Sequence, residues 1–273
     1  MPARELYKRA VGNDAVGKGA VGKDAVLGQL WHVDAGRTFF VGPLAYNALH
    51  QHGAPVFLAG IYGPFGLRIR GGNWLSCPSA VVPAGVLHEL DLGNDPLAVF
   101  YIEPNVGGIG GLTPLLGNQR EVDGVLVGRT DAFSTLREVW EDGSSARWIG
   151  EALDDLLIFS RRRAARSIDP RICAIVETMQ KLSGELTPAA RLACDVGLST
   201  SRFQHLFTEQ VGVPFRRYRA WLRLRTAIGT IAQGSNFTTA AHAAGFADHA
   251  HFTNDFRRTF GAPPSLSLRK LRI

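Results

Sequence analysis

The sequence predicts an α+β protein of two domains, an N-terminal antiparallel β-barrel with a helical segment behind it and an all-α C-terminal domain with two helix-turn-helix units. Two observations carry this prediction. Short runs of β-branched and aromatic residues, separated by Gly, Pro and Asn-Asp turns, fill the chain from about Leu30 to Pro104. The last third of the chain contains one helical unit twice. A chain of 273 residues is long enough for two hydrophobic cores.

Residues 1–29 are expected to form a low-complexity, flexible arm. A five-residue repeat runs through positions 11–26, each copy beginning Val-Gly and ending in Ala. That period matches neither a helix face nor strand alternation, and glycine opposes both structures. The alternative function is an arm that folds over a ligand site.

Residues 30–130 are expected to form the β-domain. The predicted strands are Val56–Tyr62, Gly66–Arg70, Trp74–Cys77, Ser79–Val82 and Leu97–Ile102. The glycine run at 107–111 resembles a nucleotide-binding loop only in composition. Because no Lys-Ser/Thr pair follows it, we interpret it as a surface loop.

Residues 131–168 are expected to form a helical dimerisation segment and a basic linker. Apolar residues recur at helical spacing from 131 to 160, and the resulting stripe can pack on the β-domain or on a second copy of the chain. The arginine-rich run 161–166 then leads to a domain boundary near residue 168. The default interpretation of its arginines is a solvated segment; a phosphate contact and an anionic effector are the alternatives.

Residues 169–273 are expected to form the duplicated helical domain, opened by Asp169-Pro170. The spacing Phe203-x3-Phe207-x4-Gly-x-Pro returns 49 positions later as Phe252-x3-Phe256-x4-Gly-x-Pro. A long helix over 215–233 joins the two units. Two short helices held by one rigid helix would suit two major-groove segments about 34 Å apart on one face of DNA.

Each unit is predicted to expose one polar helix face. Ser199 and Asp248 are the expected N-caps, and the phenylalanines of each helix face inward. The side chains that then point outward are the candidate DNA-binding residues: Ser201, Arg202, Gln204, His205, Thr208, His249, Ala250, Thr253, Asn254, Arg257 and Arg258.

The distribution of charge supports a nucleic-acid partner for the C-terminal half alone. The chain carries +6 overall, with +11 on residues 161–273 and −5 on residues 1–160. Most of the basic residues in the C-terminal half are arginine, which suits phosphates and guanine edges. A solvated cationic face would explain the charge, but it would not explain the repeated helical pattern.

The stretch 186–264 resembles the AraC/XylS family of transcription regulators. The resemblance rests on LSTSRF..LF....G.P, the Arg223-Leu224-Arg225 segment and GF.....F...F....G..P. It implies that the helices starting near Ser199 and Asp248 enter adjacent major-groove segments. Many members carry bulky or arginine side chains at positions where this sequence has Ser201, His205 and Asn254, so the operator sequence is not implied.

The β-domain carries motifs similar to those of cupin barrels, the usual sensor domain of arabinose-type members of this family. His50-x-His52 matches the first motif in part, and Pro83-x-Gly85-x2-His88 matches the second well. We expect an effector pocket that includes His50, His52, Trp74 and His88.

Three interpretations of these histidines stay open at this stage: a metal site, a pocket that hydrogen-bonds a small ligand, and a packed core. If residues 50 and 52 lie on one strand, both histidines point to the same side, and His88 can join them from another strand. The glutamate that usually follows the first motif in metal-binding cupins is replaced by Pro55, Val56 and Phe57. We therefore expect no metal, no cofactor and no catalytic residue.

The sequence thus predicts a sequence-specific DNA-binding regulator of transcription, an activator, controlled by a small-molecule effector at the N-terminal domain. The expected partners are double-stranded DNA, the effector, a second copy of the chain and RNA polymerase. The alternative is a cupin metal-dependent enzyme with a helical interaction domain.

The three cysteines lack CxxC spacing and suggest reduced, buried thiols. With no apolar run near ~18 residues and no signal peptide, we expect a soluble, cytoplasmic protein without membrane contact.

Overall fold

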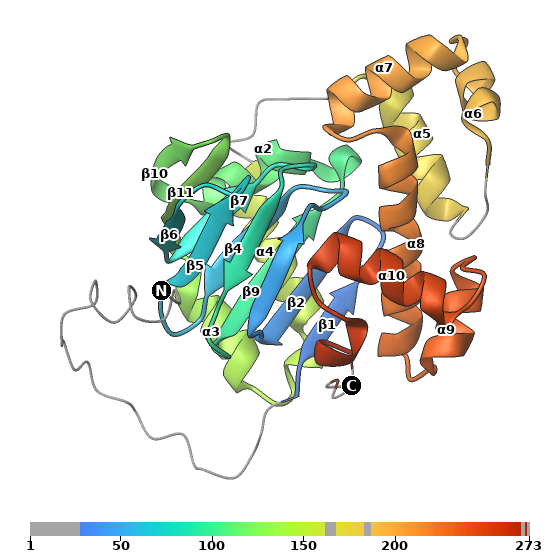
Figure 1. Cartoon of the computed structure of the whole chain (residues 1–273). Helices are drawn as coiled ribbons and strands as arrows, with labels where there is room; N and C mark the ends of the chain where they lie inside the picture. Colours follow the sequence, from blue (N-terminus) through green and yellow to red (C-terminus); the bar gives the residue numbers. More distant parts are fainter. Residues whose placement is uncertain (1–27, 162–167, 183–186, 269–270, 272–273) are drawn as a thin grey trace.

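The computed structural model describes residues 28–161, 168–182, 187–268 and 271 (Figure 1). The five-residue repeat at 11–26 and positions 162–166 of the arginine-rich run lie outside the described residues. Gln29, at the predicted end of the arm, is buried and bridges to Leu271. The ordered domain therefore includes the last residue of the segment that we assigned to the arm.

The N-terminal half forms two antiparallel sheets. The seven-stranded sheet has the order β1 (Leu30–Val33), β2 (Arg37–Pro43), β9 (Pro96–Ile102), β4 (Val56–Gly60), β7 (Ser79–Val82), β11 (Val125–Arg129) and β10 (Gly117–Val122). The four-stranded sheet has the order β3 (Tyr46–His50), β8 (His88–Asp91), β5 (Phe65–Ile69) and β6 (Trp74–Cys77).

The predicted antiparallel β-barrel is not closed in the described residues, because the two sheets keep separate edges. Helices of the C-terminal half pack against two of these edge strands, with α8 (Phe215–Ala232) on β1 and α10 (His249–Phe260) on β3. The backbone N–H of Ala48 on β3 donates to the carbonyl of Gly261, just after α10, over 3.0 Å. The helical domain thus occupies positions at which a closed barrel would continue its strand pairing.

Strand alternation divides the core into two layers. On β2, Phe39 packs with the outer helices while Phe40 faces the space between the sheets, and Phe100 and Val99 on β9 divide in the same way. The outer layer is covered by α3 (Phe133–Glu141) and α4 (Ile149–Arg161), with the 3-10 turn η3 (Ser145–Arg147) between them. The predicted apolar stripe of this segment therefore packs largely on the seven-stranded sheet.

We predicted a surface loop for the glycine run at 107–111, and the structure differs from that prediction. The run forms the short helix α2 (Gly108–Leu112) between the 3-10 turns η1 (Pro104–Val106) and η2 (Thr113–Leu115). Gly111 is buried, and a methyl group built on it would lie 3.5 Å from Ile102. Small residues let this helix pack closely on β9 and α4.

The C-terminal half is helical, as predicted. It comprises α5 (Pro170–Lys181), α6 (Ala189–Asp195), α7 (Thr200–Val211), α8, α9 (Phe237–Ala243), α10 and the 3-10 turn η4 (Pro264–Leu266). Ser199 caps α7 by accepting from Arg202 N–H, and Asp248 caps α10 by accepting from His251 N–H, as predicted. Gly245, in the turn before α10, has φ of 74°, which an L side chain rarely adopts.

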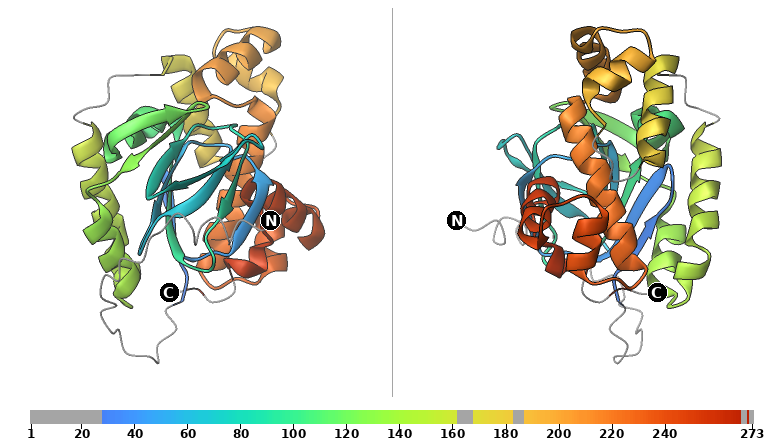
Figure 2. Two further views of the ribbon diagram at one scale, coloured as in Figure 1. Left: turned by 60° about the vertical axis from the view of Figure 1, so that its left-hand side comes forward. Right: turned by 90° about the vertical axis from the view of Figure 1, so that its right-hand side faces the viewer.

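The two halves share one continuous core. The β-domain lies between α3–α4 on one side and the C-terminal helices on the other (Figure 2). Trp221 and Tyr218 of α8 are fully buried, and Trp221 packs on Tyr101 of β9 with ring centroids 4.7 Å apart. Buried side chains of the inner sheet face and of α5 to α10 form a single hydrophobic cluster.

The cysteines only partly match the prediction. All three are free, and Cys77 is buried, which raises the pKa of its thiol to about 12. Cys173 is half-buried and Cys194 is exposed, because they lie on outward faces of α5 and α6. None of the helices in the described ranges combines the length and apolar composition that a bilayer crossing requires.

Candidate functional site

A cavity of about 420 Å³ lies where the β-domain meets the end of α10. Side chains of the β-domain, among them Trp31, Phe40, Leu58 and Tyr101, form one part of its wall. The other part comes from the C-terminal half: Phe256, Phe260, Ala262, Leu266 and Ser267. Its size and largely apolar lining are those of a small-molecule site, and a molecule bound there would contact both halves of the chain.

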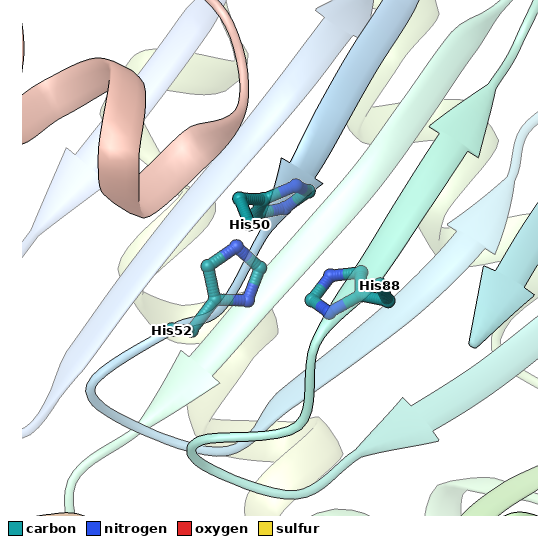
Figure 3. Close-up of side chains that lie close together, drawn as sticks. All are labelled: His50, His52 and His88. Atoms are coloured by element: carbon teal, nitrogen blue, oxygen red, sulfur yellow. The ribbon is translucent and has the colours of Figure 1, made fainter. Parts of the chain in front are cut away.

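Three buried histidines stand beside this cavity (Figure 3). His50, His52 and His88 are 2%, 3% and 0% exposed, and one ring nitrogen from each lies within 4.8 Å of the others. His50 and His52 also line the cavity. The structure therefore brings together three of the four residues predicted for the pocket.

In each ring, one nitrogen makes a hydrogen bond and the other has no protein partner among the described residues. Nδ1 of His50 pairs with the carbonyl of Ala48 at 2.7 Å, and Nδ1 of His88 pairs with the carbonyl of Val86 at 2.9 Å. His52 Nε2 lies 3.2 Å from the Tyr101 hydroxyl. Within the described residues, His50 Nε2, His52 Nδ1 and His88 Nε2 are buried with no hydrogen-bond partner.

Burial keeps the three imidazoles neutral. It lowers the pKa of His50 and His52 well below 6.5, and the neighbouring rings add to that effect. Burial also lowers the pKa of His88 to about 4. Because Nδ1 of His50 and His88 each faces a carbonyl oxygen, it must carry the proton, so the unpartnered Nε2 of each presents a lone pair.

Two details of the arrangement differ from the sequence-based picture of the site. Trp74 does not line the cavity: it lies on β6, where the guanidinium of Arg68 covers its ring at 5.0 Å. His52 is not on the strand of His50, because β3 ends at His50 and His52 lies in the following loop. The loop still turns its ring inward, where His88 at the start of β8 completes the cluster.

The end of α10 is tied to the β-domain beside these histidines. Besides the bond from Ala48 to Gly261, the side chain of Asn47 donates to the carbonyl of Phe260 at 2.8 Å. A methyl group on Gly261 would lie 2.7 Å from His50 Nδ1. The cluster, the cavity and the end of α10 are therefore in direct contact.

A buried polar network joins α8 to the β-domain. Glu103 accepts hydrogen bonds from Tyr218, Trp221 and Arg225, at 2.5, 2.8 and 2.7 Å. Arg225 also donates to Thr38 and to the carbonyl of Asp34. Burial first, and the Glu103 carboxylate second, raise the pKa of Tyr218 well above 10. The network is charge-paired and well supplied with donors, as a buried carboxylate requires.

The predicted DNA-binding side chains lie on the outward faces of α7 and α10. Ten of the eleven are exposed and Thr253 is half-buried. α7 stands near the N-terminal end of α8, and α10 crosses beside the middle of α8 (Figure 1), where Phe260 packs on Trp221 with ring centroids 6.1 Å apart. The 18 residues of α8 make it about 27 Å long. On α10 the candidates His249, Ala250 and Asn254 near the N-terminal end are exposed, while its C-terminal end packs on β3.

Sequence reasoning missed the role of Arg223 and Arg225, although both stand in the segment that carried the family resemblance. Arg223 donates to the carbonyls of Ala244 and Gly245 and stacks over Phe246 at 4.0 Å, so it supports the turn before α10. Arg225 joins the domain network. Their helical spacing alone would not have separated these roles from that of a surface arginine.

Comparison with known proteins gives the same assignment. Residues 192–270, which hold α7 to α10 and most of α6, match the model of a helix-turn-helix domain. The chain is 24% identical over 236 residues to the HTH-type transcriptional regulator NimR of Escherichia coli, covering 82% of this chain and 83% of NimR. Both matches agree with the resemblance to the AraC/XylS family of transcription regulators that the sequence motifs carry.

Solved structures of ToxT from Vibrio cholerae share the fold of this chain. The fatty-acid-bound protein of strain SCE256 aligns with a TM-score of 0.58 at 14% identity, over 87% of this chain and 96% of ToxT. The protein of strain O395 aligns with a TM-score of 0.55, also at 14% identity, over 85% and 96%. A sheet domain packed on a helical domain is therefore an architecture found in experimental structures.

Proposed function

We propose that this protein regulates transcription by binding DNA with α7 and α10, and that a small molecule in the cavity controls this binding. The observation that carries the proposal is the shared wall of the cavity, to which α10 contributes Phe256 and Phe260. A molecule that fills the cavity contacts the sensor domain and one DNA-reading helix at once. In this proposal the sensor domain is cupin-like, and α6–α7 and α9–α10 are the two helix-turn-helix units.

The DNA-binding part of the proposal follows from shape and charge. The N-terminal residues of a reading helix contact base edges in the major groove, and in both α7 and α10 these residues are exposed. The long, rigid α8 would hold the two helices so that they enter consecutive major-groove segments. The net charge of +11 on residues 161–273 supplies phosphate attraction.

The cavity suggests the chemical class of the effector. Its lining is mainly apolar and aromatic, and no Lys or Arg of the described residues contributes to it. A carboxylate buried against these side chains alone would lack a charge partner. ToxT structures have been solved with an unsaturated fatty acid and with an arylbutenoic acid. For this chain, the lining side chains alone favour an uncharged, largely apolar molecule with one or two hydrogen-bonding groups.

Control requires that the effector favours one arrangement of the two domains. A coupling free energy of about 1–3 kcal/mol between the cavity and DNA is typical of such systems. In the structure, α10 is tied to β3 by the bonds to Gly261 and Phe260. An effector that occupies the space beside Phe260 would shift the population between this docked arrangement and one in which α10 is released.

The first experiment selects genomic fragments with the full chain across a salt series and sequences the fragments recovered. We expect salt-sensitive enrichment of two short motifs about one helical turn apart. No enrichment and no salt slope would reject the regulator. If a saturating effector left both DNA affinity and motif spacing unchanged, control through the cavity would be rejected.

Two further partners belong to the same proposal. A second copy of the chain would double the number of half-sites, and the helical segment 131–168 is its proposed contact. Because the buried faces of α3 and α4 pack on the seven-stranded sheet, the contact must use their outer faces. Sedimentation at micromolar concentration with and without DNA tests the dimer.

Recruitment of RNA polymerase, as an activator requires, is tested by transcription in vitro from a promoter that carries the recovered motifs.

A further inference from the structure

We propose that His50, His52 and His88 bind one divalent transition-metal ion, and that occupation of this site controls the docking of α10 on β3. The inference deepens the proposed function by naming the ion as a regulatory ligand. It rests on the proposed function only for its effect on DNA, since binding of the ion can be measured without DNA.

The donor set fits such an ion. Three imidazole nitrogens converge within 4.8 Å of one another, and none of the three unpartnered nitrogens has another use within the described residues. Leaving a buried polar atom unpaired destabilises a fold, and a packed core would bear that cost at three atoms. Imidazole ligands suit Zn²⁺, Cu²⁺, Fe²⁺ and Ni²⁺ and are a poor choice for Mg²⁺ or Ca²⁺.

The surrounding hydrogen bonds have the arrangement found around metal ligands. A ligating histidine usually donates its second ring N–H to a carbonyl or a carboxylate, which fixes the tautomer and turns the lone pair toward the ion. Ala48 and Val86 provide such carbonyls for His50 and His88. Tyr101 provides an oxygen for Nε2 of His52, which would leave Nδ1 as the ligand.

Glu89, the acidic residue next to the cluster, forms its hydrogen bonds away from the three histidines. Glu89 follows His88 on β8, so its side chain points to the opposite face of the sheet. There it accepts from Arg68 at 2.8 and 2.5 Å and from the hydroxyl of Tyr46. The site would thus hold the ion with three neutral ligands and leave positions open beside the cavity. A bound dication would supply the charge that the lining lacks, so the cavity would then accept an effector with an anionic group.

The coupling to α10 follows from contact. Zinc–nitrogen bonds are about 2.0–2.1 Å, so three nitrogens now as far apart as 4.8 Å must approach one another when the ion binds. The ring of His50 would therefore shift, and it lies against Gly261, the residue that ends α10. The same strand carries Ala48 and Asn47, which hold Gly261 and Phe260. We infer that His50 moves away from Gly261 when the three histidines close on the ion. This movement weakens the hydrogen bonds that hold the end of α10 on β3.

The test titrates the chelator-treated full chain with Co²⁺ as a spectroscopic probe and then with Zn²⁺ as a competitor. We expect one Co²⁺ per chain, a ligand-field spectrum of nitrogen coordination and full displacement by Zn²⁺. His50→Gln, His52→Gln and His88→Gln should each weaken binding at least about 100-fold. The matched control is His242→Gln, on an exposed position of α9, which should bind as the parent does.

Variants at three positions keep the test valid if one of them does not fold. Circular dichroism identifies the folded variants, and His52→Gln, in a loop, is the substitution least disruptive to the sheet. Absence of stoichiometric Co²⁺ and Zn²⁺ binding by the parent chain would overturn the proposal. Binding that survives in the folded cluster variants would overturn it as well, because the ion would then be bound elsewhere.

The regulatory step has two readouts. Hydrogen exchange of the Ala48 amide should quicken when Zn²⁺ binds, and His242→Gln should show the same response. With the DNA motif recovered above, Zn²⁺ should change DNA affinity at least fivefold, and DNA should change Co²⁺ affinity by the factor that Co²⁺ changes DNA affinity. Metal binding without any DNA binding would reject the proposed function and leave the metal site standing. DNA binding without metal binding would reject the metal site alone.

Discussion

Arg225 and Glu103 form an ion pair 2.7 Å long that is almost fully excluded from solvent, with the two side chains 7% and 1% exposed. The carboxylate belongs to the turn after β9 and the guanidinium to α8, so the pair links the β-domain to the long helix between α7 and α9. Removing one partner of a buried pair leaves an uncompensated charge, which is far more costly than losing an exposed pair.

Arg225→Met should lower the free energy of unfolding by about 3–5 kcal/mol, because the Glu103 carboxylate would stay buried without its cation. Urea denaturation measures this change. The control is Arg191→Met, which removes an exposed pair with Asp195 of 3.4 Å and should cost at most about 1 kcal/mol. The double variant Glu103→Leu/Arg225→Met should regain part of the loss. If Arg225→Met and Arg191→Met lowered the free energy of unfolding equally, the buried pair would contribute no more to stability than the exposed pair.

Gly53→Ala should destabilise the contact between the two domains. A methyl group at this position would lie 2.4 Å from the Cβ of Trp221, so α8 would have to move. Overpacking of this kind costs about 1–3 kcal/mol, measured as a lower thermal midpoint with faster exchange in α8. Gly63→Ala is the matched control, since nothing lies within 4 Å of the added methyl group. A midpoint unchanged in both variants would mean that the domains separate freely.

Asn254→Ala should relax base preference at one position of the DNA site. Asn254 is exposed on α10, and an asparagine that makes a bidentate contact with adenine contributes about 1–3 kcal/mol of discrimination. Gln204→Ala on α7 should act in the same way in the other half-site. The measurement is affinity for a panel of single-base variants of the recovered motif. A uniform loss across the panel would refute direct base contact.

Arg257→Ala should weaken all DNA sequences alike. The side chain is exposed in the last turn of α10, where it suits a phosphate, and loss of one phosphate contact should reduce the salt-dependence slope by about 1. Binding isotherms from low to high salt give this slope. A loss confined to one base pair would instead identify Arg257 as a base-reading residue.

Asp34→Asn should reduce the acid sensitivity of the folded protein. Burial opposes ionisation of Asp34, but hydrogen bonds from His32, Arg37 and Gly36 outweigh it and hold the pKa of the carboxyl well below 3.8. The carboxylate thus stabilises the fold above that ordinary value, and the stabilisation is lost as the pH falls below about 4. The variant should show a shallower decline of unfolding free energy between about pH 5 and pH 2. Asp123→Asn, at an exposed turn, removes the same charge and should keep the parent slope.

Local signals in the sequence predicted the helical domain well, because they depend on neighbouring residues. The caps at Ser199 and Asp248, the inward phenylalanines and the turn at Gly245 involve residues a few positions apart. The strands β4, β5, β6, β7 and β9 were found for the same reason. Strands β1, β2, β3, β8, β10 and β11 were not among the predicted strands. In β10 the mostly exposed, polar residues show little hydrophobic alternation.

The parts that sequence could not supply depend on distant residues. Glu103 and Arg225 are 122 positions apart, and no periodicity connects them. The histidine cluster was predicted from a motif resemblance, but the convergence of the three rings depends on how the loop at His52 turns. Trp74 does not line the cavity, because it lies on the face of the sheet that carries Arg68. The face that a strand residue takes depends on the register, which the sequence does not specify.

The bond from Ala48 to Gly261 also protects an open strand edge. β3 is the outermost strand of the four-stranded sheet, and it displays Tyr46 and Leu49 at 47% and 52% exposure. An unpaired edge with apolar side chains is a template for pairing with another polypeptide. When α10 undocks from β3, the edge of this strand becomes exposed. The released form would therefore be more prone than the docked form to strand pairing between molecules. Release of α10 would therefore carry a risk of aggregation unless another segment covers β3.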